Sequence, residues 1–149
     1  MRWFLVGLVL VTACSSGQSV PEANKALRQV SLISTADLEA YEIAEAANDL
    51  LQVWCDDAQL VREGGEELAP EDPLLDGRSA AEIERIGSEA VELAESPELI
   101  TVLRELSLAQ AERVAILARP GKFALKKHNH AARTAVELGF GLRRWRKQR

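Results

Sequence analysis

The chain has 149 residues, of which 47% are hydrophobic, 28% charged and 5% aromatic, and its formal net charge is −5 at pH 7. This length is sufficient for one domain with a hydrophobic core, and the hydrophobic share is that of a globular protein. No apolar run reaches the roughly 20 residues that a membrane-spanning helix needs, so no such helix is expected. Alanine, glutamate, leucine and arginine dominate, which favours helices over strands.

The N-terminus combines a positive charge with a short apolar segment. Arg2 is followed by nine mostly apolar residues, Trp3 to Val11. Nine helical residues are too few to cross the hydrocarbon core of a bilayer. The segment therefore indicates an export signal rather than a membrane helix.

The run Val11-Thr12-Ala13-Cys14 follows directly and resembles the lipobox of bacterial lipoprotein signals. Such signals carry an aliphatic residue three positions before the cysteine and a small residue next to it. The resemblance implies that diacylglycerol is attached to the Cys14 thiol and that residues 1–13 are then removed. Cys14 would become the N-acylated first residue of the mature chain. The resemblance covers 14 residues and names no family for the rest.

Residues 14–21 are expected to form the lipidated cysteine and a short tether, and residues 22–149 the helical domain. The tether, Ser15 to Ser19, is rich in serine. Its r.m.s. reach is on the order of 12 Å, which keeps the domain near the membrane surface. Ser15 is not the aspartate that retains many enterobacterial lipoproteins in the inner membrane. The resemblance thus favours an exported protein that faces the periplasm, on the outer rather than the inner membrane.

Cys55 is the second of two cysteines. If Cys14 carries lipid, Cys55 has no partner for a disulfide within the chain. An intermolecular disulfide stays open in an exported compartment. A cysteine inside a helix is more often buried, and burial is the favoured reading.

The first half of the chain predicts two helices. Pro21 suits a first turn, and apolar residues then recur at helical spacing up to Ile33. Ser34 resembles a weak cap for the next helix, and Gly64-Gly65 ends it. The second helix has the most regular apolar stripe of the chain, with acidic residues on its other faces. The stripe comprises Leu38, Tyr41, Ala44, Ala47, Leu51, Trp54, Ala58 and Val61.

The middle of the chain predicts a loop and two further helices. Residues 66–78 hold two prolines among acidic residues, which predicts a solvated acidic loop rather than a calcium site of EF-hand spacing. Ser79 and Glu82 form a capping box, and Ser96-Pro97 begins the next helix. Its apolar stripe is interrupted by Gln110, which is expected at the stripe's edge, in reach of water.

The last segment, from about Lys122, predicts a helix with a seam of mostly small residues. Gly139 and Gly141 each cost roughly 1 kcal/mol relative to alanine inside a helix. We therefore expect the helix to fray before Leu142 and to leave a mobile basic tail. The residues expected to contact an anionic surface are Arg143, Arg144, Trp145, Arg146, Lys147 and Arg149.

Charge is divided unequally along the chain. Residues 119–149 hold ten Lys and Arg against one acid, a net charge of +9, whereas residues 14–118 hold seven against 22, a net charge of −15. In one interpretation the basic segment packs on the acidic body within the domain. In the other it contacts anionic lipid, since basic segments with Trp and Phe bind such surfaces. The two interpretations are compatible.

No pattern in the sequence indicates catalysis, a metal or a cofactor. His128-Asn129-His130 shares its letters with the HNH nucleases, but nothing else of that motif is present. The two imidazoles are two positions apart and fall on different sides of a helix. Phosphate-binding loops, HExxH and triad patterns are absent from the sequence.

We expect an all-α fold, an antiparallel bundle of four or five helices arranged as two hairpins joined by the acidic loop. The leading function is a non-enzymatic cell-envelope lipoprotein that presents a helical interaction surface near a bacterial membrane, to an envelope protein or anionic lipid. The alternative is a membrane-active or lysis-type accessory whose basic tail engages a second anionic surface. A ligand-binding bundle or an enzyme ranks third and would need a deep polar pocket. Nucleic acid is not an expected partner, because exported proteins rarely meet it.

The lipobox yields the first prediction. Radiolabelled palmitate should enter the wild-type protein, and Cys14→Ser should abolish the labelling and release the protein from membranes. The reason is that each buried CH₂ contributes about 0.8 kcal/mol, so a multi-chain anchor outweighs other membrane contacts. A Cys14→Ser protein that stays membrane-bound in high salt would contradict the lipoprotein interpretation.

Overall fold

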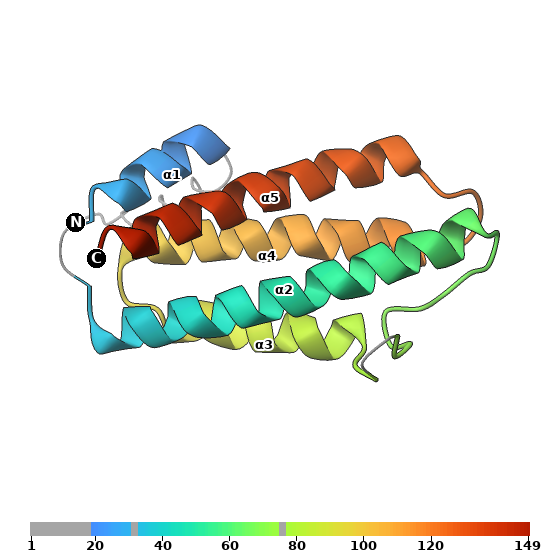
Figure 1. Ribbon diagram of the computed structural model, residues 1–149, viewed down its shortest axis with the longest axis horizontal. Helices are drawn as coiled ribbons and strands as arrows, with labels where there is room; N and C mark the ends of the chain where they lie inside the picture. Colours follow the sequence, from blue (N-terminus) through green and yellow to red (C-terminus); the bar gives the residue numbers. More distant parts are fainter. Residues whose placement is uncertain (1–18, 31–32, 75–76) are drawn as a thin grey trace, which may run out of the picture.

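The computed structural model describes residues 19–30, 33–74 and 77–149, and these form five α-helices (Figure 1). The predicted all-α bundle is thereby confirmed. The predicted signal segment and Cys14 lie outside the described residues. Within the described part, no helix is both long enough and apolar enough to cross a membrane. The helices are α1 (Val20–Arg28), α2 (Thr35–Glu63), α3 (Ala80–Leu93), α4 (Pro97–Ala118) and α5 (Leu125–Lys147).

Four long helices run antiparallel to their neighbours in sequence, and α1 lies along the bundle beside α5 (Figure 1). The most extensive contacts are α2 with α3 and α4 with α5, while α1 packs on α4 and α5. The acidic loop therefore joins the two helices of one hairpin. The prediction that it joins two separate hairpins was wrong, because α1 is too short to cover α2 and packs on the other pair instead.

Serine residues begin the helices as the sequence predicts. The hydroxyl groups of Ser34 and Ser79 accept the backbone N–H of the residue three positions on, and Ser79 and Glu82 form a complete capping box. Gly64 ends α2, and the following Gly65 has a φ of 90°, which a glycine adopts without strain. Helix α1 ends at Arg28, earlier than the periodicity up to Ile33 predicts.

A buried carboxylate on α2 caps the start of α4. Asp37 is 1% exposed, and its Oδ1 accepts the backbone N–H of Glu95 at 2.7 Å and of Ser96 at 3.0 Å. The Ser96 hydroxyl donates to Oδ2. Ser96 thus stands at the N-cap of α4, as predicted, but its side chain bonds Asp37 rather than its own helix. A negative charge here also faces the positive end of the helix dipole.

The hydrophobic core consists of two clusters. The first lies between α1, the start of α2 and α4, and the end of α5, and includes Leu27, Tyr41 and Trp145. The second lies between the end of α2, the start of α3 and the end of α4, and includes Trp54 and Cys55. The predicted stripe of α2 is confirmed from Tyr41 to Ala58, while Leu38 and Val61 at its ends are half-buried.

Cys55 is fully buried, which confirms the favoured reading. Burial raises the pKa of its thiol to about 12. The thiol therefore stays protonated near neutral pH and is out of reach of a partner's cysteine while the domain is folded. Its neighbour Trp54 is also buried, and the indole N–H donates to the backbone oxygen of Asp72 at 3.0 Å, which fixes the acidic loop to α2.

The Asp37 cap predicts a stability loss that depends on pH. Burial alone would raise the pKa of Asp37, but the hydrogen bonds from Ser96 and Glu95 outweigh it and hold the pKa below the usual 3.8. A lowered folded-state pKa contributes stability above pH 3.8, and this contribution is lost as the pH falls through the folded-state pKa. Urea unfolding at pH 7 should show that Asp37→Ala costs about 1–3 kcal/mol, because the backbone N–H groups of Glu95 and Ser96 lose their charged acceptor.

The difference between wild type and Asp37→Ala should shrink when the same measurement is made near pH 3. Glu42→Ala, which removes an exposed acid from the same helix, is the matched control and should change stability by less than about 0.5 kcal/mol. Equal losses in the two variants would show that the cap contributes nothing specific.

Candidate functional site

The basic C-terminal segment is part of a continuous helix. Helix α5 extends to Lys147 and includes both glycines at which the sequence predicts fraying. That prediction was wrong, and the reason is a close helix contact. A Cβ at Gly141 would lie 2.1 Å from the side-chain oxygen of Asn24 on α1, so the glycine leaves the space that the Asn24 side chain occupies between α1 and α5. The Asn24 amide also donates to the backbone oxygen of Glu137 at 3.3 Å.

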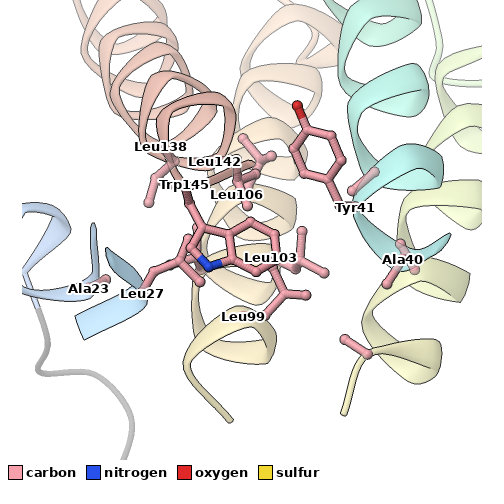
Figure 2. Packing of buried hydrophobic residues seen from close by; sticks show 14 of the residues in the cluster. Ala23, Leu27, Ala40, Tyr41, Leu99, Leu103, Leu106, Leu138, Leu142 and Trp145 are labelled. Carbon is pink, nitrogen blue, oxygen red and sulfur yellow. The ribbon is translucent and has the colours of Figure 1, made fainter. Parts of the chain in front are cut away.

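Trp145 is a core residue rather than a surface contact. Its side chain is 0% exposed and lies among Leu27 of α1, Tyr41 of α2 and Leu103 of α4 (Figure 2). The ring centroids of Trp145 and Tyr41 are 6.1 Å apart with planes inclined by 57°, an arrangement favoured between aromatic rings. The prediction that Trp145 contacts an anionic surface therefore conflicts with its burial in the folded domain. The indole anchors the last turn of α5 to three other helices.

The cations around Trp145 stay at the surface. Arg144, Lys147 and Arg149 are exposed, and Arg143 and Arg146 are half-buried. The Arg143 guanidinium lies 5.3 Å from the centroid of the Phe140 ring and 4.0 Å from the Asp49 carboxylate. The side chains of Arg143 and Asp49 are 40% and 67% exposed, so solvent screens the pair and it contributes little to stability. Four of the five cations are thus held on the last turns of α5, and Arg149 follows its end. Within the described residues, one weak ion pair is found for these cations.

Exposed apolar side chains accompany these cations, a feature absent from the sequence prediction. Leu125, Val136 and Phe140 are 44%, 44% and 58% exposed, which accounts for three of the six large hydrophobic side chains exposed in the described residues. At about 100° per residue they fall on one side of α5, opposite the buried seam. We call this the outer face of α5, and it comprises Leu125, Arg133, Val136, Phe140, Arg144 and Lys147.

The sequence could have shown this face. Positions 133, 136, 140, 144 and 147 are spaced by three and four residues, the spacing of a helical stripe. The stripe mixes cations with apolar residues, so a search for purely apolar periodicity passes over it. Phe140 also stands between the two glycines, where the propensity argument predicted a break.

A network of buried polar side chains, centred on Arg113, connects α2, α4 and α5. Arg113 is 1% exposed, and its Nη1 donates to Gln52 Oε1 at 2.7 Å and to Gln110 Oε1 at 3.3 Å. Its Nε lies 3.5 Å from His128 Nε2. Burial lowers the pKa of His128, and the charge of Arg113 lowers it further, so this imidazole accepts rather than donates toward Arg113.

Gln110 belongs to this buried group, which corrects the prediction that it reaches water. It is 4% exposed, and its side-chain amide donates to Asn48 Oδ1. Arg113 on the next turn supplies the donor that a buried glutamine oxygen needs. His130 is exposed whereas His128 is buried, which confirms that the two imidazoles face different ways. In the described ranges, no cluster of three or more His, Cys, Asp or Glu is arranged to hold a metal ion.

Comparison of the chain with protein-family models, with curated proteins and with solved structures found no match. The function is therefore argued from the geometry of its own residues.

Because Trp145 is buried, measurements of stability test whether the C-terminal segment is packed in the core or mobile. Trp145→Ala should lower the free energy of unfolding by about 3–5 kcal/mol, as large core truncations do. Truncation after Leu142, which also removes the indole, should lower the melting temperature and the helical content measured by circular dichroism. Arg144→Ala, one residue away on the surface, should change stability by less than about 0.5 kcal/mol. Unchanged stability in Trp145→Ala would restore the mobile-tail interpretation.

Proposed function

We propose that this protein is a non-enzymatic bacterial envelope lipoprotein whose helical domain holds the outer face of α5 against an anionic membrane surface. The observation that carries the proposal is the exposure of Leu125, Val136 and Phe140 among the cations of one helix face. Helices that lie on membranes have this composition, with apolar side chains that enter the headgroup region and Lys or Arg that pair with phosphates. The lipid on Cys14, implied by the lipobox resemblance, would supply the permanent anchor.

The charge distribution supports one orientation of the domain. Helix α3 lies on the side of the bundle away from α5 (Figure 1) and exposes Glu82, Glu89 and Glu92. A domain that is basic on one side and acidic on the other is oriented by a negative surface, because attraction and repulsion act together. The outer face would then turn toward the lipid headgroups and α3 toward the periplasm.

The energies are sufficient for measurable binding without the anchor. Each Lys or Arg near an anionic leaflet contributes on the order of 1 kcal/mol, and the effect fades within a Debye length of ~8 Å at physiological salt. Arg133, Arg144 and Lys147 together would contribute a few kcal/mol. Partial burial of Phe140 in the headgroup region would also favour binding, since removal of apolar surface from water contributes about 25 cal/mol of free energy per Å².

The lysis-type alternative loses its main support. It depends on a mobile basic tail that reaches a second surface, whereas α5 continues through this segment and Trp145 fixes its end in the core. A rigid face that is part of the domain suits contact with one membrane surface, rather than extension of a tail to a second surface.

Vesicle binding tests the proposal. The Cys14→Ser protein, which lacks the anchor, should sediment with vesicles containing anionic lipid at low salt, should not sediment with neutral vesicles, and should be released as salt rises. Replacement of Arg144 and Lys147 by glutamate should reduce the bound fraction at least tenfold, because attraction becomes repulsion. Phe140→Ser should weaken binding at every salt concentration, since its contribution is apolar.

The matched control makes the same change of net charge outside the outer face of α5. Arg28 and Arg104 are exposed cations on α1 and α4. Their replacement by glutamate changes the net charge equally but leaves the outer face of α5 intact, and binding should stay within about threefold of the unmodified protein. If both double variants lose binding to the same extent, net charge rather than this face governs the interaction.

A further inference from the structure

A cavity lies between α2, α3 and α4, on a part of the bundle that the membrane proposal does not use. Its volume is about 250 Å³, and it reaches the surface beside Ser88 and Leu108, which are both exposed. An engineered cavity of roughly 150 Å³ in another protein accepts benzene. This space is therefore large enough for an aromatic ring with a short side arm. Its walls are mainly apolar and include Leu51, Ile83, Leu103 and Leu106.

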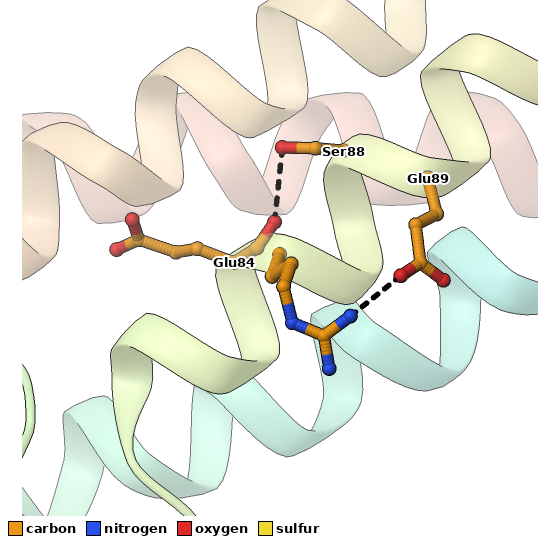
Figure 3. Close-up of polar contacts among 4 residues, drawn as sticks. Glu84, Ser88 and Glu89 are labelled. Carbon is orange, nitrogen blue, oxygen red and sulfur yellow. Dashed lines mark hydrogen bonds and ion pairs between the residues drawn. The ribbon is translucent and has the colours of Figure 1, made fainter.

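One carboxylate oxygen in the wall has no hydrogen-bond partner among the described residues. Among the residues that line the cavity, Glu84 is the only charged one. Its Oε1 is fully enclosed by protein and accepts no hydrogen bond. Figure 3 shows the Glu84 carboxylate pointing toward α4 and away from Glu89. Glu89 forms an ion pair with Arg85 at 2.7 Å. The Ser88 hydroxyl donates to the backbone oxygen of Glu84 at 3.1 Å, so it leaves the carboxylate free.

Besides Glu84, Ser88 and Ser107, the polar side chains in the wall are those of Asn48 and Gln110. The Gln110 amide donates to Asn48, and its oxygen accepts from Arg113, so these groups already have partners within the protein. Partial burial of Glu84 raises the pKa of its carboxyl group, because the charged form loses contact with water. A ligand with a positively charged donor would remove that cost, and an apolar body would displace water from the leucine and isoleucine walls.

We propose that this cavity binds a small amphipathic amine, with the protonated amino group paired to Glu84 and the apolar part packed between α2, α3 and α4. The proposal is independent of the outer face of α5 and of the lipid anchor. It rests on one enclosed oxygen, Glu84 Oε1, which accepts no hydrogen bond from the described residues, in a cavity whose lining residues include no other charged side chain.

Gly87 provides a way to close the cavity without disturbing the backbone. A Cβ at this position would lie 3.9 Å from Ser107 Oγ and 4.0 Å from the Ala47 Cβ, which is ordinary contact. A larger side chain would extend into the space between α2, α3 and α4. Leucine also has a higher helix propensity than glycine by roughly 0.8 kcal/mol, so Gly87→Leu should fold.

Two probes of matched shape test the proposal. Benzylamine carries a protonated amine near neutral pH, and benzyl alcohol has the same ring and arm without charge. Both are titrated into the full chain carrying Cys14→Ser while ¹H–¹⁵N spectra are recorded. Benzylamine should shift the amides of residues that line the cavity and should bind at least tenfold more tightly than benzyl alcohol.

Three variants decide the assignment. Glu84→Gln should remove the preference for the amine, so that the two Kd values come within threefold of each other, while Glu92→Gln, an exposed acid on the same helix, should preserve it. Gly87→Leu should abolish shifts at the lining residues with both probes while the rest of the spectrum stays folded. Absence of benzylamine shifts at the lining residues, or an equal preference in Glu84→Gln and wild type, would overturn the proposal.

Discussion

Burial of Trp145 is the contact on which the arrangement of the C-terminal helix depends. The indole fills the space between α1, α2 and α4, and a buried aromatic side chain of this size contributes several kcal/mol. This contact fixes the last turn of α5, and with it the positions of Arg144 and Lys147 at the surface. It also accounts for α1, a helix of nine residues that would be marginal alone and is held by Leu27 against the same cluster.

Because the end of α5 is fixed in the core, the basic side chains of the C-terminal segment have defined positions on the surface of the domain. In the sequence, the basic segment fits either an internal brace or a membrane contact. The structure shows that one side of this helix is buried and the other is exposed, and the proposed membrane contact concerns the exposed side. The side that bears Leu138, Leu142 and Trp145 is buried, whereas the side that bears Val136 and Phe140 is exposed. The cations stand mainly at the exposed side, and only Arg143 approaches an acidic residue of α2, so most of the positive charge stays available to an external anion.

Much of the fold follows from local signals, because capping and periodicity act within a few residues. The capping box at Ser79, the end of α2 at Gly64 and the stripe through Trp54 are all of this kind. The misinterpreted positions depend on contacts that are distant in the sequence. The glycine at position 141 lowers helix propensity locally, but it leaves space for the Asn24 side chain of α1. Gln110 interrupts an apolar stripe, but its side-chain amide has hydrogen-bond partners in Asn48 and Arg113. Nothing local indicates those partners.

The cavity beside Glu84 was also beyond local prediction, and its position has a packing explanation. Its wall joins Ala44, Leu103 and Leu106 of the first core cluster to Ala47, Leu51 and Ile83 of the second. The two clusters meet where alanine and Gly87 supply little volume and where Asn48 and Gln110 replace apolar side chains. Larger residues at these small positions would merge the clusters and improve packing, since voids in protein interiors are destabilising. The bundle leaves this space open and places the half-buried Glu84, with one enclosed oxygen, in its wall, and this combination is the basis of the proposed amine site.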